Sequence, residues 1–100
     1  MGDALTAQVA APIAHSPVGT ETILIVEDEP GLRRLMKRTL ERYGYRVLCA
    51  EDSADALAIA ERHDGTLHLL LSDVIMPGLS GANLAQQIVH LRPAIKVLYV

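Results

Sequence analysis

The amino-acid sequence predicts an α/β fold built on a parallel β-sheet. From Thr22 onward, short apolar runs alternate with stretches whose apolar residues recur at helical spacing. Such alternation is typical of parallel strands joined by right-handed helical crossovers. Two apolar runs also end in acids: Glu27 and Asp28 follow the first, and Asp73 follows another. We expect these carboxylates at the carboxyl edge of the sheet, where open α/β sheets bind ligands.

The first strand and helix have clear boundaries in the sequence. Residues 23–26 are a short apolar run, and Pro30 suits the first turn of a helix. Gly44 suits the end of that helix. The apolar residues at helical spacing between these boundaries are Leu32, Leu35, Met36, Leu40 and Tyr43. The basic residues among them are interpreted as a solvated helix face, with partner binding as the alternative: Arg33, Arg34, Lys37 and Arg38.

The remaining elements follow the same alternation. We expect Ser53 to be the N-cap of a second helix and Ser80 to be the N-cap of a third, which ends at Pro93. The turn residues Asp64 and Gly65 separate the second helix from the next strand. We expect strands at residues 45–50, 67–71 and 96–100, and helices from Ser53 to about His63 and from Ser80 to Pro93.

Composition narrows the class of protein. The 100 residues suit one small domain, and half of them are hydrophobic, enough for a modest core. A net charge of −3 gives no indication of binding to nucleic acid or to an anionic membrane, and we expect neither partner. Cys49 is the only cysteine, which excludes an internal disulfide and a cysteine-based metal site. This composition fits the cytoplasm, where we place the chain.

Several residues have ordinary structural interpretations. We interpret Glu29 as an acid at a helix start, His68 as a packed strand residue and Cys49 as a core residue. Residues 1–21 are rich in alanine and contain two prolines, so they are interpreted as a flexible tail or interdomain linker. The folded domain is expected over residues 22–100.

Two motifs carry a resemblance to a known family. Residues 25–30 read Ile-Val-Glu-Asp-Glu-Pro, and residues 71–81 read Leu-Ser-Asp-Val-Ile-Met-Pro-Gly-Leu-Ser-Gly. Both resemble the receiver domain of two-component response regulators, and the match covers residues 22–100. The resemblance implies a flavodoxin-like doubly wound parallel sheet (a CheY-like receiver) with strand order 2-1-3-4-5. Residues 19–29 look most like receivers fused to hybrid sensor histidine kinases.

The resemblance also implies roles for the acids. Asp73 matches the phosphoacceptor, which takes a phosphoryl group from a histidine kinase or a histidine phosphotransfer domain. Asp28, Asp73 and the backbone carbonyl of Ile75 match the direct Mg²⁺ ligands, and Glu27 matches a position that acts through water. The residue chemistry agrees, because carboxylates can form covalent phosphoryl intermediates and Mg²⁺ prefers oxygen ligands. Such a domain is a signalling phosphoacceptor rather than an ordinary enzyme.

The sequence departs from the family pattern at its end. A receiver normally continues with a switch Ser or Thr, a fifth strand ending in Lys and two more helices. Lys96 does not match that Lys. We therefore expect a C-terminally incomplete receiver of four strands and three helices, which binds Mg²⁺ weakly and accepts phosphate poorly. We also expect self-association through the exposed edge of the strand at 96–100.

Two function classes stay open on the sequence. The first is a phosphoacceptor domain of a two-component phosphorelay. The second is a non-phosphorylated pseudo-receiver, or a receiver fragment, that serves as an interaction or assembly module.

Overall fold

The computed structural model describes residues 21–73 and 81–99. The predicted tail therefore lies outside the described residues except for Glu21, and so do Ile75 and the predicted cap Ser80. The strands are β1 (Thr22–Val26), β2 (Arg46–Ala50), β3 (Leu69–Ser72) and β4 (Lys96–Tyr99), and the helices are α2 (Pro30–Arg42), α3 (Ser53–Arg62) and α4 (Gly81–Leu91).

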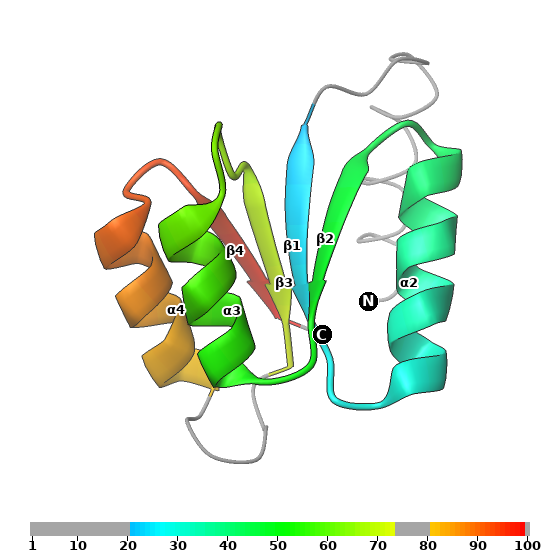
Figure 1. The fold of residues 1–100 in the computed structure, drawn as a ribbon, viewed down its shortest axis with the longest axis horizontal. Coiled ribbons are helices and arrows are strands. Elements are labelled where there is room, and N and C mark those ends of the chain that lie inside the picture. Colours follow the sequence, from blue (N-terminus) through cyan, green and yellow to red (C-terminus); the bar gives the residue numbers. More distant parts are fainter. Residues whose placement is uncertain (1–20, 74–80, 100) are drawn as a thin grey trace.

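The strands of the described residues form one parallel sheet in the order β2-β1-β3-β4 (Figure 1). This confirms the predicted α/β class and the first four places of the expected strand order. Val26 is in register with Ala50 of β2 and with Ser72 of β3. The carboxyl ends of these strands therefore lie at the same level of the sheet.

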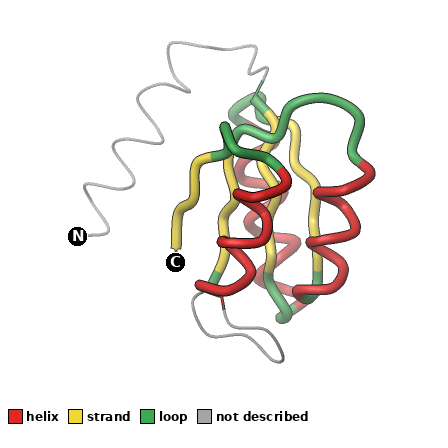
Figure 2. Tube along the Cα trace, turned by 90° about the vertical axis from the view of Figure 1, so that its left-hand side faces the viewer, coloured by secondary structure: helices red, strands yellow, loops and turns green. Residues whose placement is uncertain are grey.

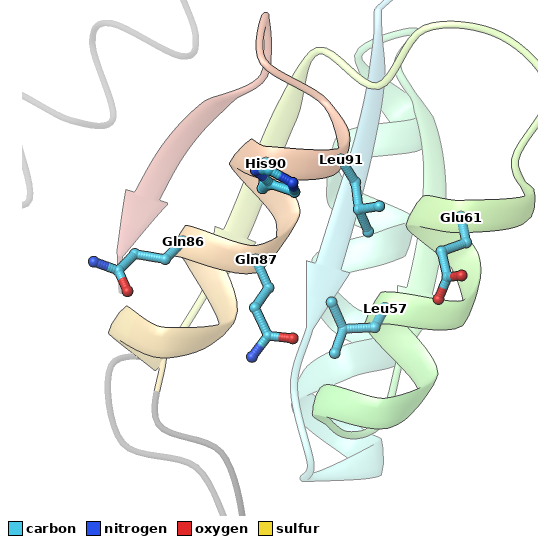
Figure 3. Close-up of a pocket in the computed structure, with 6 residues that line it drawn as sticks. All are labelled: Leu57, Glu61, Gln86, Gln87, His90 and Leu91. Atoms are coloured by element: carbon cyan, nitrogen blue, oxygen red, sulfur yellow. The ribbon is translucent and has the colours of Figure 1, made fainter.

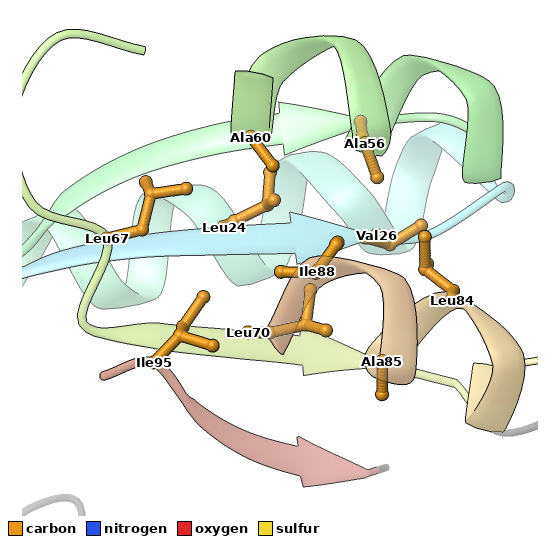
Figure 4. Close-up of a cluster of buried hydrophobic side chains, with 11 residues drawn as sticks. Leu24, Val26, Ala56, Ala60, Leu67, Leu70, Leu84, Ala85, Ile88 and Ile95 are labelled. Atoms are coloured by element: carbon orange, nitrogen blue, oxygen red, sulfur yellow. The ribbon is translucent and has the colours of Figure 1, made fainter. Parts of the chain in front are cut away.

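Helices cover both faces of the sheet and run roughly along the strand direction (Figures 1 and 2). Strand residues alternate between the two faces, as the pleat requires. Leu24 and Leu70 face α3 and α4, where they pack in the larger core cluster with Ile88 (Figure 4). Ile23 and Ile25 belong to the smaller cluster on the face covered by α2. The buried residues of both clusters are aliphatic.

Only part of the apolar stripe predicted for helix α2 packs on the sheet. Met36 and Leu40 pack against the smaller core cluster, but the exposed fractions of Leu32 and Leu35 are 44% and 59%. Each residue turns a helix by about 100°, so Arg33 shares the stripe of Met36 and Leu40 at i+3 and i+7. The exposed fraction of the Arg33 side chain is only 18%, so the interpretation of Arg33 as part of the solvated face is wrong.

The starts of the helices agree with the sequence in one case and correct it in another. Glu29 caps α2 by accepting hydrogen bonds from the backbone N–H groups of Gly31 and Leu32, which confirms it as a helix-start acid. The N-cap of α3 is Asp52 rather than Ser53, because the Asp52 carboxylate accepts from the Asp55 N–H at 2.8 Å. Ser53 is instead the first helical residue.

The strand predicted at 67–71 is also shifted. β3 runs over Leu69–Ser72, two residues later at its start and one at its end. His68 precedes it, and the N–H of His68 donates to the Thr22 carbonyl at 2.9 Å. The Nδ1 atom of His68 accepts from the Thr22 N–H at 2.9 Å. His68 therefore has a structural role, joining the start of β1 to the segment before β3, but its prediction as a strand residue is wrong, because β3 begins at Leu69.

Candidate functional site

The sheet brings the predicted acids together at the ends of β1 and β3. Glu27 directly follows Val26, and Asp73 directly follows Ser72, and these two strand residues are paired. The ends of β1 and β3 lie next to each other in Figure 1. The expected meeting of acids from separate parts of the sequence therefore occurs at the carboxyl edge.

Glu27 is the most constrained of the three acids. Its exposed fraction is 5%, its N–H donates to the Ala50 carbonyl at 3.0 Å, and its Oε2 accepts from the Glu29 N–H at 3.1 Å. Burial raises the pKa of Glu27, and the carboxyl groups of Asp28 and Asp73 raise it further, against the opposing effect of the Glu29 hydrogen bond. The Asp28 and Asp73 side chains are therefore close enough to act on Glu27 electrostatically.

The other two acids are more accessible to solvent. Asp28 is exposed and Asp73 is half-buried. The hydroxyl of Ser72 donates to the Asp73 backbone carbonyl at 3.0 Å. The site thus combines a buried carboxylate with two that a solute can reach.

The chemistry of these donors suits a hard cation. Among the residues that the structure describes, no three acidic, histidine or cysteine side chains are grouped closely enough to form a metal-binding cage. Mg²⁺ is commonly held by one or two carboxylates and several waters, so it does not require such a cage. A set of carboxylate oxygens without nitrogen or sulfur donors fits Mg²⁺.

Arg33 is the residue of this region that the sequence interpretation missed. Its Nη1 donates to the Glu27 backbone carbonyl at 2.7 Å, and its Nη2 lies 3.9 Å from an Oε2 of Glu51. Helical spacing from Met36 was the signal that could have placed Arg33 on the inner stripe.

A separate pocket of about 410 Å³ lies between α3 and α4 (Figure 3). Its ionisable residues are Glu61 and His90, one from each helix, and Leu57 and Leu91 supply apolar surface. It does not include the acids at the strand ends, so it is distinct from the candidate site.

The half-buried thiol of Cys49 packs beside the smaller core cluster, and burial raises its pKa.

None of the helices over residues 21–73 and 81–99 combines the length and apolar character needed to cross a bilayer.

Several known proteins are similar to this chain. The sensor kinase CckA of Brucella abortus is 37% identical over 82 residues, which are 82% of this chain and 9% of CckA. The chain thus spans less than a tenth of that relative. The crystal structure of the receiver domain of the hybrid histidine kinase CckA is 38% identical with a TM-score of 0.68, and the match covers 78% of this chain and 83% of that one.

Two solved structures add a ligand and a partner to the comparison. The response regulator TrrA of Thermotoga maritima, in complex with Mg²⁺-BeF, is 34% identical with a TM-score of 0.69, covering 80% of this chain and 68% of TrrA. The complex of the histidine kinase ThkA with TrrA matches at 35% identity and a TM-score of 0.67, covering 78% of this chain and 66% of that one. The model of the response regulator receiver domain family matches residues 23–100. On this match, together with its fold, the chain belongs to the response regulator receiver domain family of two-component signalling.

Proposed function

We propose that this receiver accepts a phosphoryl group on Asp73 from a phosphohistidine donor in the cytoplasm, with Mg²⁺ as cofactor. An oxygen of the Asp73 carboxylate forms the new bond to phosphorus. The bond from phosphorus to the donor imidazole nitrogen breaks, and its electron pair stays on that nitrogen. The residues proposed to hold Mg²⁺ are Asp28, Asp73 and the Ile75 carbonyl, with Glu27 acting through water.

The single observation that carries this proposal is the pairing of Val26 with Ser72. It sets Glu27 and Asp73 at adjacent strand ends, although they are far apart in the sequence. A bound cation would offset the mutual repulsion of the carboxylates and shield the phosphoryl oxygens as charge develops on them. The Mg²⁺-BeF complex of the similar TrrA supports this choice of cofactor.

Acetyl phosphate tests the proposal without a partner protein. The full-length product of the gene is incubated with acetyl phosphate and Mg²⁺, and its mass is then measured. We expect an increase of about 80 Da, one phosphoryl group, located on Asp73 by peptide mapping. Asp73→Asn and omission of Mg²⁺ should each abolish it. A folded protein that binds kinase yet never gains this mass would instead favour the pseudo-receiver or interaction module.

The phosphodonor is proposed to dock on the exposed side of α2. Leu32 and Leu35 are apolar and accessible there, close to the start of the helix that follows the acids. Exposed apolar residues at this position provide a surface that a helical partner can cover. The complex of the similar TrrA with the histidine kinase ThkA supports a histidine kinase as this partner. We propose a histidine phosphotransfer domain as the alternative donor, since it also presents a phosphohistidine.

Substitution of Leu35 distinguishes docking of the kinase from the transfer of the phosphoryl group to Asp73. We expect Leu35→Asp to lower phosphoryl transfer from the cognate kinase about tenfold relative to transfer from acetyl phosphate, since a central apolar contact is worth over 1 kcal/mol. Val89→Asp on α4 is the matched control, because Val89 is also apolar and exposed. Equal losses with both donors, or an equal loss in the control, would argue against docking through α2.

Self-association through the β4 edge stays a prediction. In the described residues β4 pairs with β3 on one side only, and Tyr99 is 41% exposed. Lys96 is exposed at the start of the strand, and charged residues of this kind oppose edge pairing. Light scattering of this chain over a range of concentrations measures whether the unpaired edge or the charge of Lys96 decides the oligomeric state. A monomer at every concentration would exclude self-association through β4.

A further inference from the structure

Arg33 is a basic side chain that folds inward over the acidic end of the sheet. The exposed fraction of its side chain is 18%, against 68% for its neighbour Glu51. Its Nη1 donates to the Glu27 carbonyl at 2.7 Å, a short distance typical of a charge-assisted hydrogen bond. The contact with Glu51 is longer, at 3.9 Å, and lies at an exposed carboxylate, so it contributes little.

The carbonyl that Arg33 binds belongs to the peptide that joins Glu27 to Asp28. A peptide is planar, so the direction of this carbonyl fixes the direction of the Asp28 N–H and limits where the Asp28 side chain starts. The other groups of Glu27 are already held, because its N–H donates to Ala50 and its carboxylate accepts from the Glu29 N–H. The hydrogen bond from Arg33 holds the remaining polar group of Glu27, its backbone carbonyl.

The position of Arg33 on its helix is also fixed. Its own N–H donates to the Glu29 carbonyl at 2.9 Å in the first turn of α2, and Met36 packs one turn further on. The guanidinium therefore reaches the loop from a helix that is anchored on the sheet. A group held in this way can orient a flexible loop.

We propose that Arg33 is a positioning residue for the Mg²⁺ site, which orients the Glu27–Asp28 peptide so that Asp28 points toward the cation. This inference rests on the proposed function, because it assigns Arg33 to the same site. The hydrogen bond from Arg33 goes to a backbone carbonyl, so it occupies no carboxylate oxygen of Glu27, Asp28 or Asp73 that Mg²⁺ would need.

The test is Mg²⁺ affinity, measured by calorimetry on the full-length product of the gene. We expect Arg33→Met to weaken binding about tenfold, the lower end of losses for residues that orient metal ligands. Arg33→Lys retains one donor for the Glu27 carbonyl and should recover at least part of the loss. Arg34→Met, an exposed neighbour on the same helix turn, is the control and should bind Mg²⁺ like the wild type.

A second readout does not depend on the metal. The Asp28 amide resonance in a Mg²⁺-free NMR spectrum should shift in Arg33→Met and return toward the wild-type position in Arg33→Lys. Wild-type affinity and an unmoved Asp28 amide in a folded Arg33→Met protein would overturn the role of Arg33 and leave the proposed function standing. A wild-type protein without saturable Mg²⁺ binding would overturn both. If Arg33→Met does not fold, Arg33→Gln takes its place, because its shorter, neutral side chain keeps a polar group on the helix: weaker Mg²⁺ binding with a shifted Asp28 amide supports the role, and wild-type affinity with an unmoved amide overturns it.

Discussion

At the scale of single residues, Glu27 is a group of the candidate site whose burial lowers the stability of the fold. A buried carboxylate beside two others is unfavourable, and its raised pKa reports that cost. Glu27 lies directly after β1, at a buried position that a hydrophobic residue could fill. Such local conflicts between stability and sequence are expected at functional sites, where a ligand compensates for them.

The pKa of Glu27 predicts the effect of removing its charge. A folded-state pKa above the unfolded value of about 4.3 means that ionised Glu27 destabilises the fold at neutral pH. This penalty is fully present above the folded-state pKa and disappears as the pH falls below the unfolded value. We therefore expect Glu27→Gln to raise the melting temperature in EDTA at pH 7.

The control for this prediction is the same measurement at about pH 4, where Glu27 is largely protonated in the fold. There the difference in melting temperature between Glu27→Gln and the wild type should shrink. Added Mg²⁺ at pH 7 should stabilise the wild type more than the variant. A variant that melts below the wild type in EDTA at pH 7 would show that the carboxylate stabilises the fold.

The acids of the site could be located from the sequence, but their surroundings could not. Glu27, Asp28 and Asp73 directly follow apolar runs, and parallel strands place such residues at one edge. Arg33 was misplaced because a basic residue is usually solvated, whereas its hydrogen bond to a backbone carbonyl depends on tertiary structure. The predicted ligand at Ile75 lies outside the described residues.

At the scale of elements, Arg92 joins the end of α4 to the end of α3. Its guanidinium donates to the backbone carbonyls of Ala60, His63 and Gly65. These carbonyls lie in and just beyond the last turn of α3, where the helix leaves its acceptors unpaired and the dipole favours a cation. Arg92 thus serves as a C-terminal cap supplied by another helix.

Removal of this cap should destabilise the domain. We expect Arg92→Met to lower the free energy of unfolding by about 2 kcal/mol, in the range for hydrogen bonds to charged groups. Urea denaturation followed by circular dichroism measures the change. Arg38→Met removes an exposed guanidinium from α2 and should change the free energy by less than about 0.5 kcal/mol. Equal losses would mean that Arg92 acts only through general surface charge.

The boundaries of elements were predictable where one residue dominates the local geometry. Pro30 begins α2, and Gly44 follows its end with a φ of 97°, a conformation that suits glycine. At α3, two adjacent residues could each act as the N-cap. The N-cap is Asp52 rather than Ser53, and the choice depends on where the helical backbone begins. β3 begins two residues later than predicted, because His68 hydrogen-bonds to Thr22 before the regular strand pairing begins.

At the scale of the whole molecule, the two faces of the sheet differ in how completely they are covered. The face under α3 and α4 holds the larger core, with Leu24, Leu70 and Ile88 fully buried. No residue of α2 is buried, and its partly buried Met36 and Leu40 pack on a smaller cluster. The resemblance to receiver domains implied helices on both faces of the sheet, but the periodicity of a helix alone does not reveal how deeply that helix packs.

This asymmetry predicts unequal costs for the same substitution on the two faces. Leu70→Ala should lower the free energy of unfolding by about 3–5 kcal/mol, because it opens a cavity in a fully buried core. Leu40→Ala removes the same atoms from a half-buried site that solvent can fill, and about half that loss is expected. Urea unfolding of both variants, with wild type in parallel, gives the comparison. A larger loss for Leu40→Ala would place the stabilising core under α2 instead.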